Sequence, residues 1–195
     1  MKLSLDLVTA SPPEWVQTVM ADFPSFLQDH ADCERKASAM AMSFVAKYPD
    51  RSEIIPELIE TALEELGHFQ QVYAHMEKRG IRLAREMTRD PYITSLTDLC
   101  HTDPLGRFLD RLLLASIIEC RGAERFRLVW GAIDGDPELK EFYHHLWVSE
   151  ARHGNIFVEM ALRYFPEDQV YARLTELNGA EGEIVSGLKL RPALH

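Results

Sequence analysis

Two sets of acidic residues and histidines with identical spacing limit what this chain can fold into. In the first set, Glu34 precedes Glu65 by thirty-one residues, and His68 follows Glu65 by three. The second set repeats these spacings 85 positions later in the chain: Glu119, Glu150 and His153. A chain of this composition is expected to contain about one Glu-x-x-His motif by chance. Two such motifs, each preceded by a glutamate at the same long spacing, are not expected by chance. The pattern predicts two similar helical hairpins, each with Glu on its first helix and Glu-x-x-His on its second.

Helical periodicity runs through most of the chain and is interrupted by short turn signals. These signals are Pro49-Asp50, Asp90-Pro91, Asp103-Pro104, Asp134-Gly-Asp-Pro137 and Phe165-Pro166. They leave five long helices, predicted at 24–48, 53–80, 105–133, 138–164 and 167–188. A short helix is predicted to begin in the PPEW segment at 12–15, with Ser11 as its N-cap. The stretch 81–104 is the longest irregular connection, and its length suits a crossover between two helical hairpins.

Helical phase separates the two sets from a similar pair of residues. Glu141 and His144 also form Glu-x-x-His, with Asp110 thirty-one residues upstream of Glu141. Glu141 lies nine residues before Glu150, about two and a half turns at 3.6 residues per turn, so the two side chains point to opposite faces. The face of Glu150 carries apolar residues at helical spacing. We therefore expect the two repeated sets to face inward, and Glu141 and Asp110 to face outward.

Carboxylates on buried helix faces require compensation. Four of them would repel one another and cost several kcal/mol each unless cations neutralise them. Two divalent ions balance four negative charges and turn this cost into binding energy. One Glu from each of two helices and Glu-x-x-His from each of the other two is typical of ferritin-like di-iron and di-manganese bundles. Oxygen-rich ligation with one imidazole per ion favours iron, with manganese second, over zinc.

The predicted fold is therefore all-α: a ferritin-like four-helix bundle with a long crossover and an additional C-terminal helix, forming a single di-iron domain over residues 1–195. The residues predicted to bind the two metal ions and to be catalytic are Glu34, Glu65, His68, Glu119, Glu150 and His153. Glu65 and Glu150 are placed to bridge the two ions. Glu34 and His68 complete the coordination of one ion, and Glu119 and His153 complete the coordination of the other.

Four further residues lie near the predicted ligands in the sequence. Cys33 and Cys120 are each adjacent to one, but neighbouring residues on a helix are about 100° apart, so we expect these thiols to pack in the core. Arg121 and Arg125 are expected to form ion pairs on the surface.

Composition excludes several classes of protein. The formal net charge of −10 argues against indiscriminate nucleic-acid binding but leaves room for a local basic patch. The longest apolar run, at 112–118, is far shorter than the roughly 20 residues that span a membrane, and the N-terminus has no apolar signal region. We expect a cytoplasmic protein without a membrane partner. Three cysteines without C-x-x-C spacing predict neither a disulfide framework nor a zinc ribbon.

The segments around the predicted ligands resemble those of the MiaE family of tRNA hydroxylases. The similar segments are CERKAS around Glu34, EELGHF around Glu65, IECRGAERF around Glu119, SEARH around Glu150 and the C-terminal LKLRPALH. The resemblance runs from Leu3 to the C-terminal residue of the sequence. The ligand pattern alone is shared by ferritin-like carboxylate proteins in general, so the flanking segments carry the narrower assignment.

This resemblance implies a non-haem di-iron monooxygenase that acts on 2-methylthio-N6-isopentenyl-adenosine next to the anticodon of tRNA. It implies hydroxylation of the isopentenyl group, in which one oxygen atom of O2 enters a C–H bond and the other leaves as water. The two electrons required come from an external reductase, because the chain has no flavin or nicotinamide fingerprint such as GxGxxG. The implied partners are tRNA, O2 and this electron donor.

A tRNA substrate requires a surface that contacts phosphate groups. The densest basic run supplies the candidate RNA-binding residues: Lys78, Arg79, Arg82, Arg85 and Arg89. The alternative explanation for the first two is the end of a helix, where positive side chains complement the helix dipole. A second candidate surface is the tail with Lys189, Arg191 and His195.

Two alternative functions share the ligand pattern. One is a ferritin-like oxidoreductase on another substrate, such as a manganese catalase or a rubrerythrin-like peroxidase, although the chain lacks the C-x-x-C pairs of a rubredoxin-type iron site. The other is an iron-storage bundle, which is expected to assemble into a large shell. A native mass near that of a monomer or dimer would count against storage.

Overall fold

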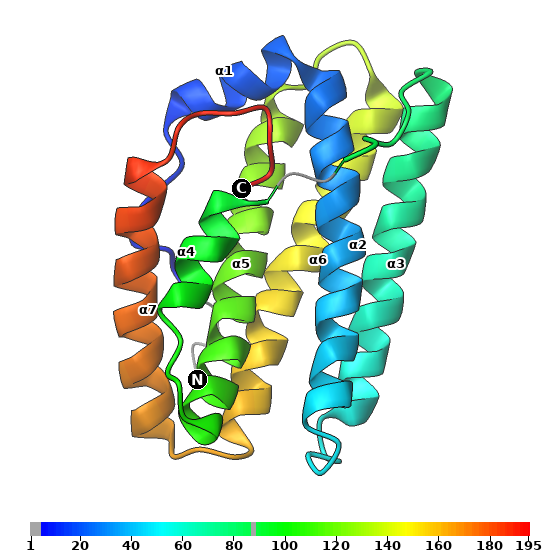
Figure 1. Ribbon diagram of the computed structural model, residues 1–195. Coiled ribbons are helices and arrows are strands. Elements are labelled where there is room, and N and C mark those ends of the chain that lie inside the picture. The colour runs from blue at the N-terminus through cyan, green and yellow to red at the C-terminus, as the bar shows by residue number, and fades with distance from the viewer. Residues whose placement is uncertain (1–4, 87–88) are drawn as a thin grey trace. The chain divides into compact units, whose positions relative to one another are not determined.

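Seven α-helices form the regular structure of residues 5–86 and 89–195, the part of the chain that the computed structural model describes. They are α1 (Pro13–Ala21), α2 (Phe23–Lys47), α3 (Ile55–Lys78), α4 (Pro91–Asp98), α5 (Pro104–Ala132), α6 (Pro137–Leu162) and α7 (Glu167–Gly187) (Figure 1). These residues contain no strand. The five predicted long helices are all present, with ends within two residues of the predicted positions. The all-α prediction is confirmed.

The helices belong to two units, and each is described by itself. The α2–α3 unit comprises Gln17–Thr88 and Arg191–Leu194, and its two long helices pack along each other. The α5–α6 unit comprises Met1–Val16, Arg89–Leu190 and His195. In it α5 and α6 form the second hairpin, and both α4 and α7 pack against α5 (Figure 1).

Asp-Pro pairs start three of the helices. In each pair the aspartate is the N-cap, and its side chain accepts a hydrogen bond of 2.8–3.0 Å from a backbone N–H two or three residues on. The proline takes the first helical position, where its missing N–H leaves no hydrogen bond unmade. The pairs are Asp90-Pro91, Asp103-Pro104 and Asp136-Pro137. The turn signals of the sequence therefore set the points at which helices begin.

Helix α4 corrects the prediction that 81–104 is irregular throughout. Its start signal, Asp90-Pro91, is visible in the sequence. Tyr92 and Leu96 are buried one helical turn apart, which gives the helix an apolar face. Eight residues make only two turns, so helical periodicity was too short to detect.

Helix α3 ends at a glycine, where the candidate RNA-binding run begins. Gly80 has a φ of 67°, in the left-handed region that glycine adopts without strain. Its N–H donates to the carbonyl of Glu77 at 3.1 Å, and the N–H of Ile81 donates to the carbonyl of Met76 at 3.0 Å. These two bonds form a Schellman motif, which terminates the helix.

The prediction that Arg121 and Arg125 form surface ion pairs is wrong. Both are buried, with exposed fractions of 0% and 4%. Arg121 donates to Glu181 of α7 at 2.8 and 2.9 Å and to Glu124 at 2.9 Å, and the hydroxyl of Tyr92 also donates to Glu181. Burial, and then the charge of Arg121, lowers the pKa of Arg125 to about 10. Because α7 and the N-terminal segment cover this side of α5, polar residues on it are enclosed.

Ser11 does not cap α1 as predicted. Its hydroxyl and its N–H both donate to the carboxylate of Glu124, each at 2.7 Å. The hydroxyl also accepts from Nε of Arg125 at 3.1 Å. Ser11 thus ties the N-terminal segment to α5.

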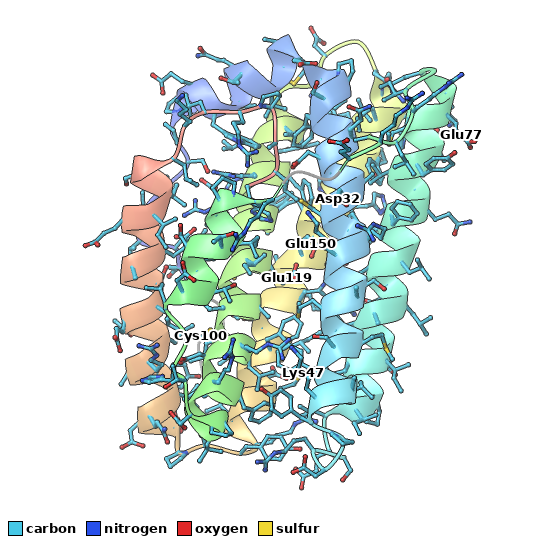
Figure 2. The ribbon with its side chains drawn as sticks, viewed as in Figure 1. Asp32, Lys47, Glu77, Cys100, Glu119 and Glu150 are labelled. Atoms are coloured by element: carbon cyan, nitrogen blue, oxygen red, sulfur yellow. The ribbon has the colours of Figure 1, made fainter. Side chains whose placement is uncertain are left out.

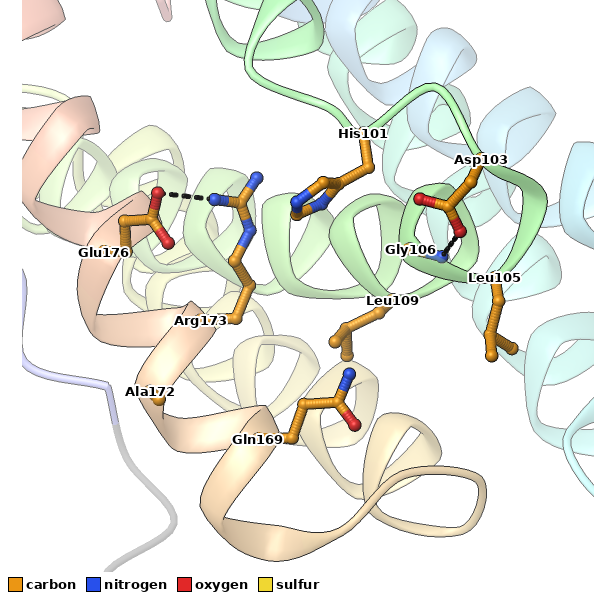
Figure 3. A pocket seen from close by; sticks show the side chains of 9 residues that line it. All are labelled: His101, Asp103, Leu105, Gly106, Leu109, Gln169, Ala172, Arg173 and Glu176. Carbon is orange, nitrogen blue, oxygen red and sulfur yellow. Dashed lines mark hydrogen bonds and ion pairs between the residues drawn. The ribbon is translucent and has the colours of Figure 1, made fainter.

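Asp110 is fully buried, which corrects the prediction that it faces outward. Its carboxylate accepts hydrogen bonds from Arg173 of α7 and from both the backbone N–H and Nδ1 of His101, at 2.7–3.1 Å. Arg173 and His101 line an open pocket of about 460 Å³ (Figure 3). Arg173 also pairs with Glu176. The charged groups of this pocket therefore hold α5, α7 and the loop before α5 together.

Candidate metal centre

The first ligand set lies within the α2–α3 unit. Helix α2 carries Glu34, and α3 carries Glu65 and His68 one turn apart. All three side chains are buried, with exposed fractions of 9% or less. Nδ1 of His68 lies 3.3 Å from Oε2 of Glu65 and 3.6 Å from Oε2 of Glu34. Each residue offers a ligand atom within 4.8 Å of those of the other two.

A hydrogen bond between the two helices fixes their register beside this set. The hydroxyl of Ser38, one turn after Glu34, donates to the carbonyl of Ala62 at 2.7 Å. Ala62 precedes Glu65 by three residues, so the bond lies close to the ligands on both helices.

The second ligand set has the same arrangement within the α5–α6 unit. Helix α5 carries Glu119, and α6 carries Glu150 and His153. Figure 2 shows Glu119 and Glu150 close together, midway along the two helices. Nδ1 of His153 lies 3.1 Å from Oε2 of Glu150, and the ligand atoms of all three residues lie within 4.8 Å of one another. All three side chains are buried, His153 completely.

Gly154 allows α5 and α6 to approach closely beside His153. A Cβ on this glycine would lie 2.5 Å from Sγ of Cys120, closer than atoms can pack. The hydroxyl of Ser116 donates to the carbonyl of Gly154 across the same contact. Burial, with the nearby charge of Glu119, raises the pKa of Cys120 to about 12. Cys120 is therefore a packed, protonated thiol, whereas metal binding requires a thiolate.

Each set suits a divalent metal ion. Two carboxylates and one imidazole supply oxygen and nitrogen donors and two negative charges. Atoms that bind one ion at about 2.1 Å lie about 3 Å from each other at right angles, near the 3.1–3.6 Å separations found in both sets. Burial without such an ion would leave the carboxylates of each set repelling one another.

The sequence comparisons give the chain its family. A family model described as tRNA-(MS[2]IO[6]A)-hydroxylase (MiaE) matches residues 3–195. The chain belongs to the MiaE family. Among curated MiaE relatives, the tRNA 2-(methylsulfanyl)-N(6)-isopentenyladenosine(37) hydroxylase of Pseudomonas putida is 35% identical over 176 residues, which cover 90% of this chain and 84% of that protein. The hydroxylase of the same name from Salmonella typhimurium is 25% identical, with 90% of this chain and 82% of that protein covered.

A solved structure is also similar to this MiaE-family chain. It is a protein from Synechococcus described as having aldehyde deformylating oxygenase activity. The two chains superpose with a TM-score of 0.88 and are 33% identical, over 95% of this chain and 92% of the other. The ferritin-like fold predicted from the sequence is confirmed.

One buried residue of the site is missing from the sequence-based prediction. Nε2 of His30, on α2, lies 2.7 Å from Oε1 of Glu34, and His30 has no exposed surface. Its position four residues before Glu34 places it on the same helix face, which is a signal that the sequence contains. The repeat does not reveal it, because His30 has no histidine counterpart in the second set.

The candidate RNA-binding residues differ in their surroundings. Lys78, Arg82 and Arg85 are exposed in the α2–α3 unit. Arg79 is partly buried and donates to the carbonyl of His75 at 2.9 Å, as the helix-end explanation requires. Arg89 belongs to the α5–α6 unit, where its Nε donates to the hydroxyl of Thr94 at 3.1 Å.

The tail and the remaining polar candidates are placed as follows. His195 is buried and stacks on Tyr92, with ring centroids 5.0 Å apart, so it is not presented to RNA as the sequence suggested. Lys189 is exposed. Glu141, predicted to face outward, is 70% exposed and pairs with His145. Within the described residues, no helix has the length and apolar character needed to cross a membrane.

Proposed function

We propose that this chain is an O2-dependent, non-haem di-iron monooxygenase that hydroxylates the isopentenyl group of 2-methylthio-N6-isopentenyl-adenosine next to the anticodon of tRNA. The observation that carries the proposal is the pair of buried ligand sets, in a chain that belongs to the MiaE family. The names of the two curated relatives support the same base as substrate. A tRNA substrate also agrees with the cytoplasmic location expected from the sequence.

In the proposed site, six residues of this chain would hold two iron ions. Glu34 and His68 would bind one ion, Glu119 and His153 the other, and both Glu65 and Glu150 would bridge them. Iron is preferred to manganese because O2-dependent C–H hydroxylation is redox chemistry of iron–carboxylate sites. When bound, the ions supply O2 activation, so that one oxygen atom enters the C–H bond and the other leaves as water, with two electrons from an external reductase.

The chain itself supplies position and a dry environment. Ser38 and Ser116 fix the register of the two hairpins beside the ligands. On α6, Tyr143 and Phe157 have no exposed surface, and they lie on the side of the helix that carries Glu150. Apolar neighbours of this kind keep water from the ligands and strengthen electrostatic interactions among them.

The first experiment uses the iron-loaded protein, tRNA that carries the isopentenylated base, a chemical reductant and O2. Mass spectrometry of the digested nucleosides should show a gain of one oxygen on the prenylated adenosine. Glu119→Ala should abolish this product, whereas Glu141→Ala, an exposed glutamate on α6, should retain it. No product from a protein that holds two irons in reduced form would overturn the substrate assignment.

The same preparation distinguishes the alternatives. Turnover of hydrogen peroxide without tRNA would indicate a catalase or peroxidase. Turnover of an aldehyde, the substrate class named for the Synechococcus protein, would indicate a deformylating oxygenase. A native mass far above that of a dimer, with many irons per chain, would indicate storage.

A further inference from the structure

His30 is a buried histidine that the proposed chemistry does not use. It lies on α2 one turn before Glu34, and none of its surface is exposed. Its Nε2 is 2.7 Å from Oε1 of Glu34, closer than either contact of Nδ1 of His68 with the carboxylates of the first set. The imidazole also packs on the ring of Phe26, with centroids 5.8 Å apart. Packing and hydrogen bonding therefore hold both side chains in one geometry.

The chemistry of this bond determines which atom donates. A metal-binding carboxylate is ionised and can only accept, so Nε2 of His30 must carry the hydrogen. The bond occupies Oε1 of Glu34. The other oxygen, Oε2, lies 3.6 Å from Nδ1 of His68, a separation suited to two atoms that bind one ion. His30 thus takes one oxygen of Glu34 and leaves the other beside the histidine ligand.

The internal repeat shows that this support is specific to the first set. The position 85 residues after His30 is Ala115, which is buried on α5 four residues before Glu119. A methyl group cannot donate a hydrogen bond. Both sets contain the same three residue types. His30 and Ala115 therefore mark a difference in how Glu34 and Glu119 are held.

We propose that His30 is a positioning residue, which orients Glu34 through one oxygen and thereby strengthens metal binding by the first ligand set alone. The inference rests on the proposed function, because it takes Glu34 as a metal ligand. Hydrogen-bond partners of metal ligands typically contribute about 10–100-fold to metal affinity. The two metal ions consequently bind with unequal dependence on His30.

The test compares Co(II) binding by the apoprotein and three variants. His30→Gln keeps an N–H donor near the position of Nε2, whereas His30→Leu fills the same space without a donor. His145→Ala is the matched control, because His145 also lies 2.7 Å from a glutamate one turn away but on the exposed surface. Equilibrium titration gives the two affinities, and the visible absorption of bound Co(II) reports its ligand geometry.

The expected result is selective. His30→Leu should weaken one of the two Co(II) sites by about 10–100-fold and change its absorption, with the other site unaffected. The Co(II) affinities of His30→Gln should remain within a few-fold of those of the unmodified protein, and the affinities of His145→Ala should equal them. The inference is overturned if His30→Leu binds both ions with unchanged affinity and spectrum, or if His30→Gln loses as much affinity as His30→Leu. Fewer than two Co(II) ions on the unmodified protein would overturn the two-metal assignment, while any difference between the two His30 variants would still decide the role of His30.

A second measurement uses the unmodified protein, so it does not depend on the folding of a variant. In protein labelled with ¹⁵N at histidine and loaded with Zn(II) as a diamagnetic probe, the Nε2 of His30 should carry a proton and keep it when the metal binds. A His30 Nε2 that lacks a proton, or that loses it to Zn(II), would show that His30 does not support Glu34 in this way.

Discussion

Glu65 and Glu150 belong to different helical hairpins but hold the same position in the repeat, and we propose both as bridging ligands. Replacing either with alanine should therefore reduce the affinity for both ions, because each would lose a donor. The helices should persist, since removing a buried carboxylate also removes repulsion within its set. Metal analysis after gel filtration should show fewer than two irons per chain, with an unchanged far-ultraviolet circular dichroism spectrum.

Glu141 supplies the control for this prediction. It lies on α6 with Glu150 but is 70% exposed, so Glu141→Ala should keep both irons. Unchanged iron content in Glu65→Ala or Glu150→Ala would contradict the bridging role.

The sequence identified candidate ligands by their spacing, because a helical repeat places residues of equal spacing on equivalent faces. It did not identify His30, whose role depends on one contact with Glu34 and not on the repeat. It also misplaced Arg121, Arg125 and Asp110. The periodicity of one helix shows its most apolar face but not that α7 covers another side of α5.

At the level of the helices, the close contact between α5 and α6 depends on Gly154. Gly154→Ala should force the helices apart beside His153 and destabilise the protein by about 1–3 kcal/mol, as overpacking generally does. Cys120→Ala removes the sulfur that a new Cβ would meet, so the double variant should recover most of this loss. Urea denaturation of the single and double variants measures both effects.

Gly131, on α5, is a glycine whose position has room for a side chain. A Cβ there would meet nothing within 4 Å, so Gly131→Ala should stabilise α5 by about 0.5–1 kcal/mol. If Gly154→Ala and Gly131→Ala changed the free energy of unfolding equally, close packing at Gly154 would not explain the effect of Gly154→Ala.

Helix α7 is held to α5 by a carboxylate whose effect on stability depends on pH. Burial alone would raise the pKa of Asp110, but hydrogen bonds from Arg173 and His101 outweigh burial and lower it below its ordinary value of 3.8. A carboxyl group with a lowered folded pKa contributes stability that is complete above the unfolded pKa and is lost as the pH falls through the folded value. Asp110→Asn should therefore cost about 2 kcal/mol at pH 7. This difference should shrink as the pH falls below 3.8.

Unfolding measurements from pH 7 to pH 2.5 would follow this change. Asp98→Asn is a suitable control, because Asp98 is exposed at the end of α4. A difference between the Asp110 variant and the unmodified protein that stays constant down to the lowest pH would show that the ionised carboxylate is not responsible.

For the whole molecule, the formal charge of −10 makes any binding of tRNA dependent on a local basic surface. Each phosphate contact contributes about one unit to the slope of log affinity against log salt concentration. The single substitutions Lys78→Ala, Arg82→Ala and Arg85→Ala should each reduce the magnitude of this slope by about 1 and weaken tRNA binding at low salt. Arg107→Ala removes the same charge from an exposed position on α5 and should leave the slope unchanged. Equal slopes for all variants would exclude these residues as phosphate contacts.

The prediction of a single di-iron domain over residues 1–195 has a thermodynamic test. If two ions are bound by ligands from both hairpins, unfolding of either hairpin releases metal, so the loaded protein should unfold in one cooperative transition. Metal at 100 times its Kd should add about 2.7 kcal/mol per bound ion to the free energy of unfolding, and a chelator should remove this gain. Calorimetry that resolved two transitions, only one of them responsive to metal, would contradict the prediction.

The contrast between His30 and Ala115 bears on the ancestry of the chain. Two identical hairpins joined as a symmetric dimer can offer two metal ions only identical surroundings, because symmetry copies every substitution into both subunits. A duplicated hairpin within one chain is free of this constraint, and each copy can change alone. A histidine beside the first glutamate and an alanine beside the second form a difference that no symmetric ancestor could have carried.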